Sequence, residues 1–151
     1  MLRDQINDAL KSAMKARDQR QVSTLRLINA AIQSAEIETG GQGKAALANA
    51  EILGILQKMI KQRQESADIY EKAGRAELAA QERAEIEIVS AYLPKQMSDV
   101  EAGAAISAIL QEINAQGMKD MGRVMTALKD RFTGKLDFAK ASAKVKELLK
   151  G

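Results

Sequence analysis

The residues with the clearest chemical potential are basic side chains near the C-terminus of this 151-residue chain. Residues 117–151 carry nine Lys and Arg but only four Asp and Glu, whereas residues 1–93 carry thirteen of each kind. Cations of this kind can neutralise phosphates and bind nucleic acid in a salt-dependent way. Composition alone favours a solvated helix face as the explanation of this pattern. The candidate binding side chains are Lys119, Arg123, Lys129, Arg131, Lys135, Lys140 and Lys144.

Few aromatic side chains accompany these cations. Phe132 and Phe138 lie on apolar stripes, so we do not expect them to stack on bases. Contact with RNA would then involve its backbone and its shape. Exposed charges and structural ion pairs better explain two further basic groups, which are Lys58, Lys61 and Arg63 in one stretch and Lys15, Arg17, Arg20 and Arg26 in another.

The chain contains no histidine and no cysteine, which excludes several kinds of site. Ser-His-Asp and Cys-His catalysis, disulfides and zinc sites of the Cys/His kind all need one of these residues. Glu82 and Glu85 are three residues apart, as in half of a di-iron motif, but such motifs also use histidines. The glycine-rich segment 40–43 lacks the lysine of a phosphate-binding loop. The composition leaves carboxylate or lysine chemistry and oxygen-only metal sites open. No motif in the chain points to them, so we expect no catalytic residue, no metal site and no cofactor.

Strong helix formers dominate the composition, so we predict an all-α fold. The single proline, Pro94, should stop a helix that arrives through Leu93, because proline disfavours helical geometry at the preceding residue. Ser98 and Glu101 then have the spacing of a capping box, which begins a new helix. We infer an N-terminal helical domain at 1–93, built as an elongated bundle, and a C-terminal three-helix tail domain at 98–151.

Apolar residues at spacings of three and four predict the individual helices. The expected ranges are 2–16, 22–37, 50–73, 75–93, 100–115, 120–132 and a last helix that Asp137 caps. We expect Asn49 to cap the third helix, Gly74 to end it in the left-handed conformation and Gly117 to end the fifth. Three glycines predict a flexible loop at 39–47.

The longest stretch without a charge, 102–111, has ten residues and is too short to span a bilayer. Asp4 and Asp8 interrupt the region where a signal peptide would be apolar. These observations predict a cytoplasmic protein without a membrane partner. They leave its oligomeric state open.

Three ordered stretches resemble one known family. They are KMIKQRQES at 58–66, which Tyr70 and AGRAELAAQE at 73–82 follow; YLPKQMS at 92–98; and MGRVMTALK at 121–129, which GKLD at 134–137 follows. In this order and spacing they resemble the YqeY family. That family is similar to the C-terminal helical and tail domains of GatB, the B subunit of the glutamine-dependent amidotransferase that acts on misacylated Glu-tRNA(Gln) and Asp-tRNA(Asn).

The resemblance implies the tRNA-contacting appendage of a carbon–nitrogen ligase with glutamine as amido-N-donor, without its catalytic domains. The protein would bind tRNA and would not be catalytic alone. Gly122 lies in the matching tail region, where a missing side chain could let a partner backbone approach, although close helix packing explains it as well. The alternative is a helical interaction module that docks onto amidotransferase subunits or another assembly.

Overall fold

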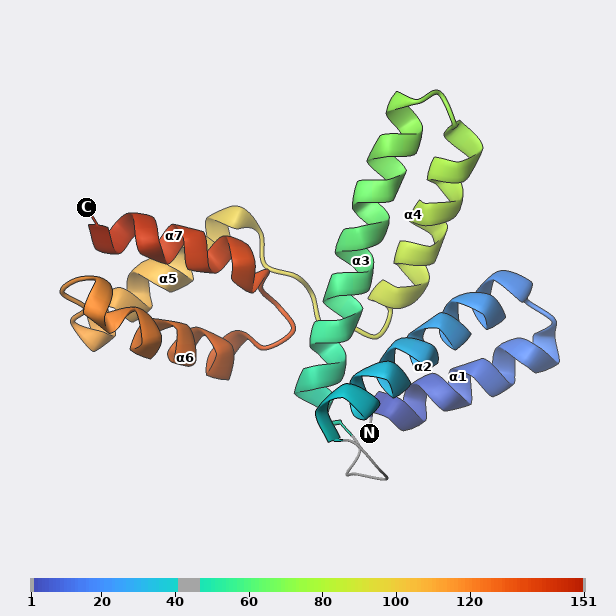
Figure 1. Ribbon diagram of the computed structural model, residues 1–151, viewed down its shortest axis with the longest axis horizontal. Helices are drawn as coiled ribbons and strands as arrows, with labels where there is room; N and C mark the ends of the chain where they lie inside the picture. The colour runs from blue at the N-terminus through green and yellow to red at the C-terminus, as the bar shows by residue number, and fades with distance from the viewer. Residues whose placement is uncertain (1, 41–46, 151) are drawn as a thin grey trace. The chain divides into compact units, whose positions relative to one another are not determined.

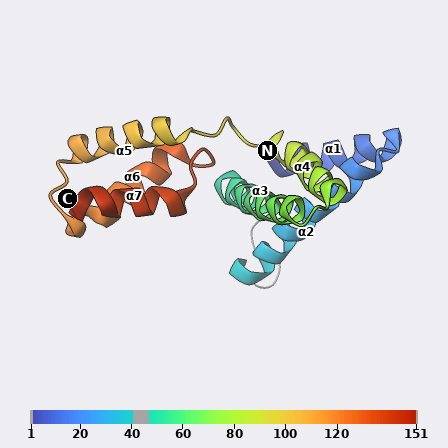
Figure 2. The ribbon, with the colours of Figure 1, turned by 90° about the horizontal axis from the view of Figure 1, so that it is seen from above.

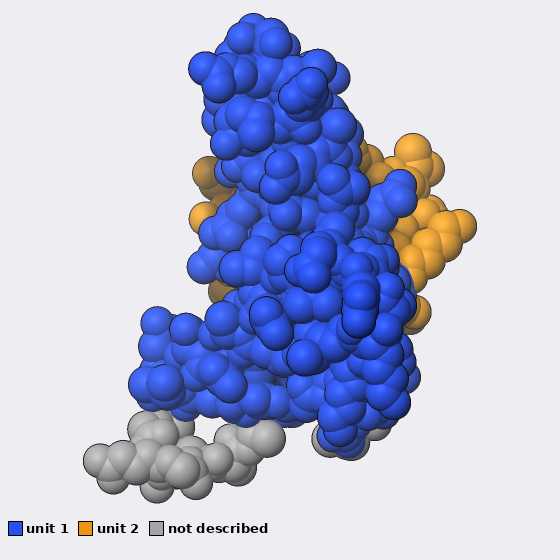
Figure 3. All heavy atoms as spheres, turned by 90° about the vertical axis from the view of Figure 1, so that its right-hand side faces the viewer, with its two compact units in different colours: residues 1–94 blue, residues 95–151 orange. Residues whose placement is uncertain are grey.

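A computed structural model describes residues 2–40 and 47–150 of the chain (Figure 1). Within these residues the secondary structure consists of seven α-helices and one short 3-10 helix, which confirms the predicted all-α class. None of these helices combines the length and apolar character that crossing a bilayer demands. The chain divides into two compact units, residues 1–94 (unit 1) and residues 95–151 (unit 2), which Figure 3 colours separately.

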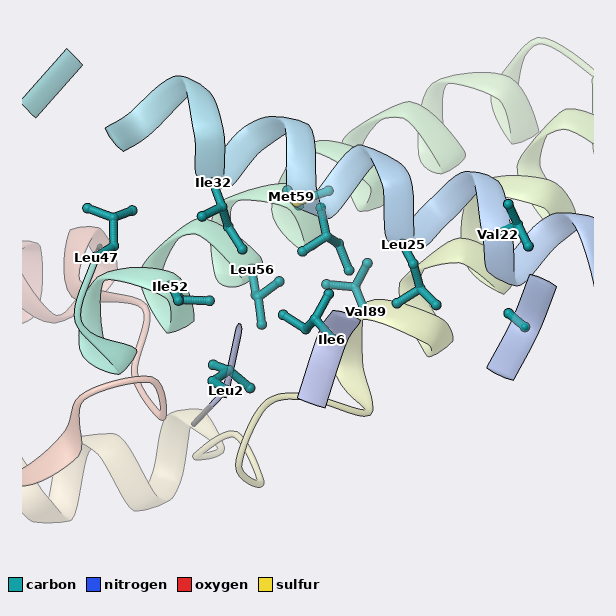
Figure 4. Packing of buried hydrophobic residues seen from close by; sticks show 12 residues of the cluster. Leu2, Ile6, Val22, Leu25, Ile32, Leu47, Ile52, Leu56, Met59 and Val89 are labelled. Atoms are coloured by element: carbon teal, nitrogen blue, oxygen red, sulfur yellow. The ribbon is translucent and has the colours of Figure 1, made fainter. Parts of the chain in front are cut away.

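Unit 1 contains two helical hairpins. Its helices are α1 (Leu2–Ala16), α2 (Gln19–Gly40), α3 (Asn49–Lys72) and α4 (Ala76–Ser90). The first hairpin pairs α1 with α2, the second pairs α3 with α4, and α2 also packs against α4. Ile6, Leu25, Leu56 and Val89, one from each helix, are completely buried in the shared core (Figure 4). Burial of one such side chain stabilises the fold by about 1.5–3 kcal/mol.

Unit 2 contains α5 (Asp99–Ile113), the 3-10 helix η1 (Met118–Asp120), α6 (Met121–Phe132) and α7 (Phe138–Lys150). The three α-helices contact one another pairwise and lie side by side in two views (Figures 1 and 2). Their separate core is formed by Ile106, Ile109, Val124, Leu128, Leu136, Ala141 and Val145. The Met97 N–H donates to the Lys135 carbonyl at 2.9 Å, which attaches the segment before α5 to the α6–α7 turn.

The local signals around the helix ends are partly confirmed. Ser98 Oγ accepts from the Glu101 N–H at 3.1 Å, and a Glu101 carboxylate oxygen accepts from the Ser98 N–H at 2.9 Å, so the capping box is present. Gly74 has φ +76 and ends the first helix of its hairpin in the left-handed conformation, as predicted. Asp137 Oδ1 accepts from two N–H groups in the first turn of α7 and caps that helix.

Other helix ends differ from the prediction because tertiary contacts or alternative caps override the local pattern. Asn49 does not cap α3; its Oδ1 accepts from the Leu2 N–H at 3.2 Å, and Ala48 occupies the N-cap position. Asn114, with φ 58, ends α5 in place of Gly117. Asn is one of the few residues besides Gly that adopts this left-handed conformation readily.

Two further boundaries of unit 1 are corrected. The fourth helix ends at Ser90, and the Leu93 N–H donates back to the Ser90 carbonyl at 3.1 Å in a turn. The break imposed by Pro94 therefore reaches further back than Leu93. The second helix continues to Gly40, where the sequence predicts a loop. Residues 41–46 of that predicted loop lie outside the described residues, and Leu47 is buried in the core.

A buried hydroxyl in α2 gives a first testable prediction. Thr24 is completely buried, and its Oγ1 has no hydrogen-bond partner in the part of the chain that the structure describes. A buried polar group without a partner costs about 1–3 kcal/mol, and valine has the same shape without the hydroxyl. Thr24→Val should therefore raise the free energy of unfolding by about 1 kcal/mol in urea denaturation. Thr24→Ser should lower it, because serine keeps the hydroxyl and removes a buried methyl group. A valine variant no more stable than the wild type would contradict this reading.

Candidate nucleic-acid interface

Five lysines form the exposed part of the predicted interface. Lys119 lies on η1, Lys129 on α6, Lys135 in the α6–α7 turn, and Lys140 and Lys144 on α7. All five are exposed. None of them forms an ion pair with a carboxylate of residues 2–40 or 47–150. Their ammonium groups are therefore available to an external anion. We refer to them as the lysine set.

The apolar stripes of α6 and α7 determine where these lysines lie. Val124 and Leu128 of α6 and Val145 of α7 are completely buried in the core of unit 2. Because helical residues three and four apart share a face, Lys140 and Lys144 project from one side of α7, away from that core. Burial of the apolar stripes thus keeps the lysines on the surface.

Arg123 has a structural role that the sequence did not indicate. Its Nη2 donates to the Ile113 carbonyl at 2.8 Å, and its Nη1 lies 3.6 Å from Asp120 Oδ1. Ile113 is the last residue of α5, whose terminal carbonyls have no partner within the helix. The guanidinium therefore supports the end of α5, although 60% of the side chain is exposed.

Arg131 is also engaged within unit 2. Its Nη2 lies 2.6 Å from Glu112 Oε2, which links α6 to α5. The hydrogen bond that the Arg131 guanidinium donates to the Glu112 carboxylate raises the pKa of Arg131 above its usual value. Both side chains are about half exposed, so the pair contributes little stability by itself. The Glu112 carboxylate already balances the charge of Arg131, so Arg131 is less available than the lysine set to an external phosphate.

Gly122 is exposed in the first turn of α6. A Cβ atom built on it would have no heavy atom within 4 Å. Close helix packing therefore does not explain this glycine. The same open space would admit a partner, but it would also admit a small side chain. Met118, beside Lys119, is 42% exposed.

Asp120 organises the turn that carries Lys119. One oxygen of its carboxylate accepts from the Gln116 N–H at 2.7 Å, and its own N–H donates to the Gly117 carbonyl at 2.9 Å. The residue is only 7% exposed. The hydrogen bond from Gln116 is the main cause that holds the pKa of Asp120 below its usual range. Sequence analysis predicted only that Asp120 begins a helix. Its hydrogen bond with the Gln116 N–H could not be predicted, because a turn contact of this kind leaves no periodic pattern in the sequence.

The lowered pKa of Asp120 gives a prediction for the pH dependence of stability. The folded protein binds fewer protons than the unfolded chain near the usual aspartate pKa, so this contribution is complete above about pH 5 and is lost as the pH falls through the lowered pKa. Asp120→Asn should lower stability at pH 7 and flatten its decline on acidification, measured by urea denaturation from pH 7 to 3. The control is Asp130→Asn, an exposed residue of α6 that should behave like the wild type. An Asp120→Asn profile parallel to that of the wild type would contradict the assignment.

In the basic stretch of α3, Arg63 stabilises the packing of two helices. Arg63 Nε lies 3.3 Å from Glu85 Oε2, and the side chains of both residues are 15% exposed. Arg63 Nη1 also donates to the Met59 carbonyl at 3.4 Å. This partly buried pair joins α3 to α4 and engages Glu85, one of the carboxylates considered for a metal site. The described residues contain no group of three or more acidic side chains arranged to hold a metal ion.

Comparison with known proteins gives the family. The family described as YqeY-like protein matches residues 3–149. The chain is 34% identical to "Altered inheritance of mitochondria protein 41, mitochondrial" of Clavispora lusitaniae over 70% of this chain and 61% of that protein. The protein of the same name from Meyerozyma guilliermondii is 34% identical over 76% of this chain and 57% of its own length. The relative from Pyrenophora tritici-repentis is 25% identical over 93% and 76% of the two chains.

These relatives correct one expectation and confirm another. Their names place them in mitochondria, which contradicts the cytoplasmic location that the sequence predicted. The chain spans 55–61% of the length of the first three curated relatives that it matches. The resemblance drawn from the three sequence stretches is confirmed by a match over almost the entire chain. The protein belongs to the YqeY-like family.

Proposed function

We propose that this protein binds tRNA through the phosphates of the RNA backbone, as an accessory of the kind that contacts tRNA in a glutamine-dependent amidotransferase. The observation that carries the proposal is the lysine set of unit 2, five exposed ammonium groups without a carboxylate partner among the described residues. An ammonium on a flexible stem contacts a phosphate as a point charge and needs no fixed geometry. Such contacts position a nucleic acid without reading its bases.

The aromatic residues of unit 2 support backbone contact over base recognition. Phe132 and Phe138 are half-buried and pack against the core of unit 2. Proteins that read single-stranded bases usually stack them on exposed aromatic rings. Exposed lysines without such rings suit recognition of charge and shape, which a folded RNA offers. Without histidine or cysteine the chain is suited to holding tRNA for chemistry done elsewhere.

The first experiment is tRNA binding by the purified protein at about 0.05 and 0.2 M salt, with single-stranded DNA of equal length as the control. We expect binding selective for tRNA. If all five lysines contact phosphates, log K should fall with log salt at a slope of about −4.5. This corresponds to a loss of affinity of several hundredfold over that range, roughly. Equal and weak binding to both polymers would overturn the proposal.

Exposed apolar side chains favour a second candidate, a module that docks onto amidotransferase subunits. Val100 on α5 is 83% exposed, and Ile37 on α2 and Ile69 on α3 are 71% and 66% exposed. The test is co-purification with the amidotransferase subunits before and after nuclease treatment. Association that survives nuclease would support docking, whereas association that nuclease abolishes would favour the tRNA proposal.

A further inference from the structure

The turn between α1 and α2 holds an arginine in an unfavourable backbone conformation. Arg17 has φ 57, in the left-handed region. Its N–H donates to the Met14 carbonyl at 3.2 Å, and the Asp18 N–H donates to the Ala13 carbonyl at 3.1 Å. These two bonds form a Schellman motif, the helix ending in which glycine normally occupies the left-handed position.

The other hairpin of unit 1 provides an internal comparison. At the end of α3 the Gly74 N–H donates to the Glu71 carbonyl at 3.1 Å, and the Arg75 N–H donates to the Tyr70 carbonyl at 2.8 Å. The bonding pattern is the same, but glycine occupies the left-handed position. A side chain other than Asn, Asp or Gly is disfavoured in this conformation. Arg17 therefore keeps a charged side chain at a position where glycine would be the more stable choice.

The surroundings of Arg17 are strongly basic. Residues 11–20 carry four basic side chains and one acidic one, whereas residues 68–77, around the other turn, carry two basic and three acidic ones. Lys11, Lys15, Arg17 and Arg20 are exposed and form no ion pair with a carboxylate in residues 2–40 or 47–150. The carboxylate of Asp18 instead accepts from the Gln21 N–H at 3.2 Å, at the start of α2.

We infer that the α1–α2 turn is a second contact for the backbone phosphates of the same RNA, with Arg17 as its central cation. This inference rests on the proposed function. Guanidinium groups match the geometry of phosphate oxygens in a bidentate way, and two of the four cations are arginines. The strained backbone of Arg17 lies at the surface and does not help folding, which favours a role in binding.

The burial pattern of α1 disfavours an anionic membrane as the partner. Helices that bind in the membrane interface insert a continuous apolar face. The apolar face of α1 packs into the core of unit 1, where Ile6 and Ala13 are buried. Met14, 50% exposed, is the large apolar side chain left at this end of the helix. A polyanion that needs only charge and hydrogen bonds fits the turn better.

Two contacts in one chain reinforce each other. Unit 1 would supply the α1–α2 turn and unit 2 the lysine set, and residues 91–98 join α4 to α5. If residues 91–98 let both contacts engage one RNA at once, the second contact becomes intramolecular and gains an effective concentration without any new interaction. Loss of either contact should then weaken binding while leaving the other able to hold the RNA.

The test uses Arg17→Gly in the full chain, with Arg75→Gln as the matched control at the turn of the other hairpin. Glycine relieves the backbone and removes the charge, so the melting temperature should rise by about 4 °C. The tRNA affinity should nevertheless fall about fivefold at 0.15 M salt, and the salt slope should decrease by about 0.9. Arg17→Lys should restore the salt slope, because it keeps the charge, but should bind more weakly than the wild type, because an ammonium cannot contact a phosphate in a bidentate way. Arg75→Gln should leave affinity unchanged.

The outcomes separate this inference from the proposed function. If the wild type binds tRNA and Arg17→Gly binds equally well, the second contact is wrong while the proposed function stands. If the wild type does not bind tRNA, the proposed function itself is wrong, and with it the inference. A loss with Arg75→Gln as large as that with Arg17→Gly would show dependence on total charge and would also overturn the inference. A third outcome would also overturn the inference: the wild type binds anionic vesicles through Arg17, and the Arg17→Gly variant binds tRNA as tightly as the wild type.

Discussion

Replacing Lys119, Lys129, Lys140 and Lys144 together with glutamine is expected to lower tRNA affinity about 10²- to 10³-fold at 0.15 M salt. Each phosphate contact contributes about 0.9 to the slope of log K against log salt, so this slope should become shallower by about 3.6. The substitutions remove exposed charges without a carboxylate partner in the described part of the chain, so helicity and melting temperature should stay close to those of the wild type. Fluorescence anisotropy with labelled tRNA over a salt series measures both quantities.

A control variant carries Lys58→Gln and Lys72→Gln, which remove exposed cations from α3 in unit 1. Its affinity per removed charge should fall far less than that of the lysine variant. Equal losses per charge would show that net charge, and no particular surface, governs binding. The design leaves Arg123 intact, because its guanidinium supports the Ile113 carbonyl and its replacement would mix a folding defect with a binding defect.

Leu128→Ala is expected to unfold unit 2 while unit 1 stays folded. Leu128 is completely buried on α6 among Ile109, Val124 and Val145. Truncating a buried leucine to alanine costs about 2–5 kcal/mol. A single core in a unit of this size supplies only about 3–5 kcal/mol. Unit 1 has its own core, which this substitution does not touch. The variant should therefore lose much of the tRNA binding assigned to the lysine set.

Circular dichroism and calorimetry would measure this outcome. The variant should lose the helical signal of α5, α6 and α7 and keep a melting transition for unit 1. Leu148→Ala is the matched control, since Leu148 lies on α7 of the same unit but is 39% exposed. Its melting profile should be close to that of the wild type. Loss of all helicity in the Leu128 variant would mean that the two units unfold as one, and an unchanged profile would mean that unit 2 tolerates the cavity.

Several helix ends were predictable because their causes are local in the chain. The capping box of Ser98 and Glu101 closes over three residues, and Gly74 adopts a conformation that its missing side chain permits. The end assigned to Gly117 was wrong because Asn114 meets the same backbone requirement earlier. The cap assigned to Asn49 was wrong because its side chain bonds to Leu2, 47 residues away in sequence. No periodic pattern encodes a partner at that distance.

The sequence by itself determined the helical class, the apolar stripes, the excess of basic residues near the C-terminus and the family resemblance. These features depend on residue type, on spacings of three and four, and on short motifs, all of which can be read along the chain. Only the tertiary structure showed which of the candidate cations interact with other groups of the protein. Arg123 donates a hydrogen bond to the Ile113 carbonyl at the end of α5, and Arg131 forms an ion pair with Glu112. The lysine set has no such partner among the described residues and stays exposed. Folding decides which charges are balanced, because a carbonyl or carboxylate ten or more residues away becomes a neighbour only when helices pack.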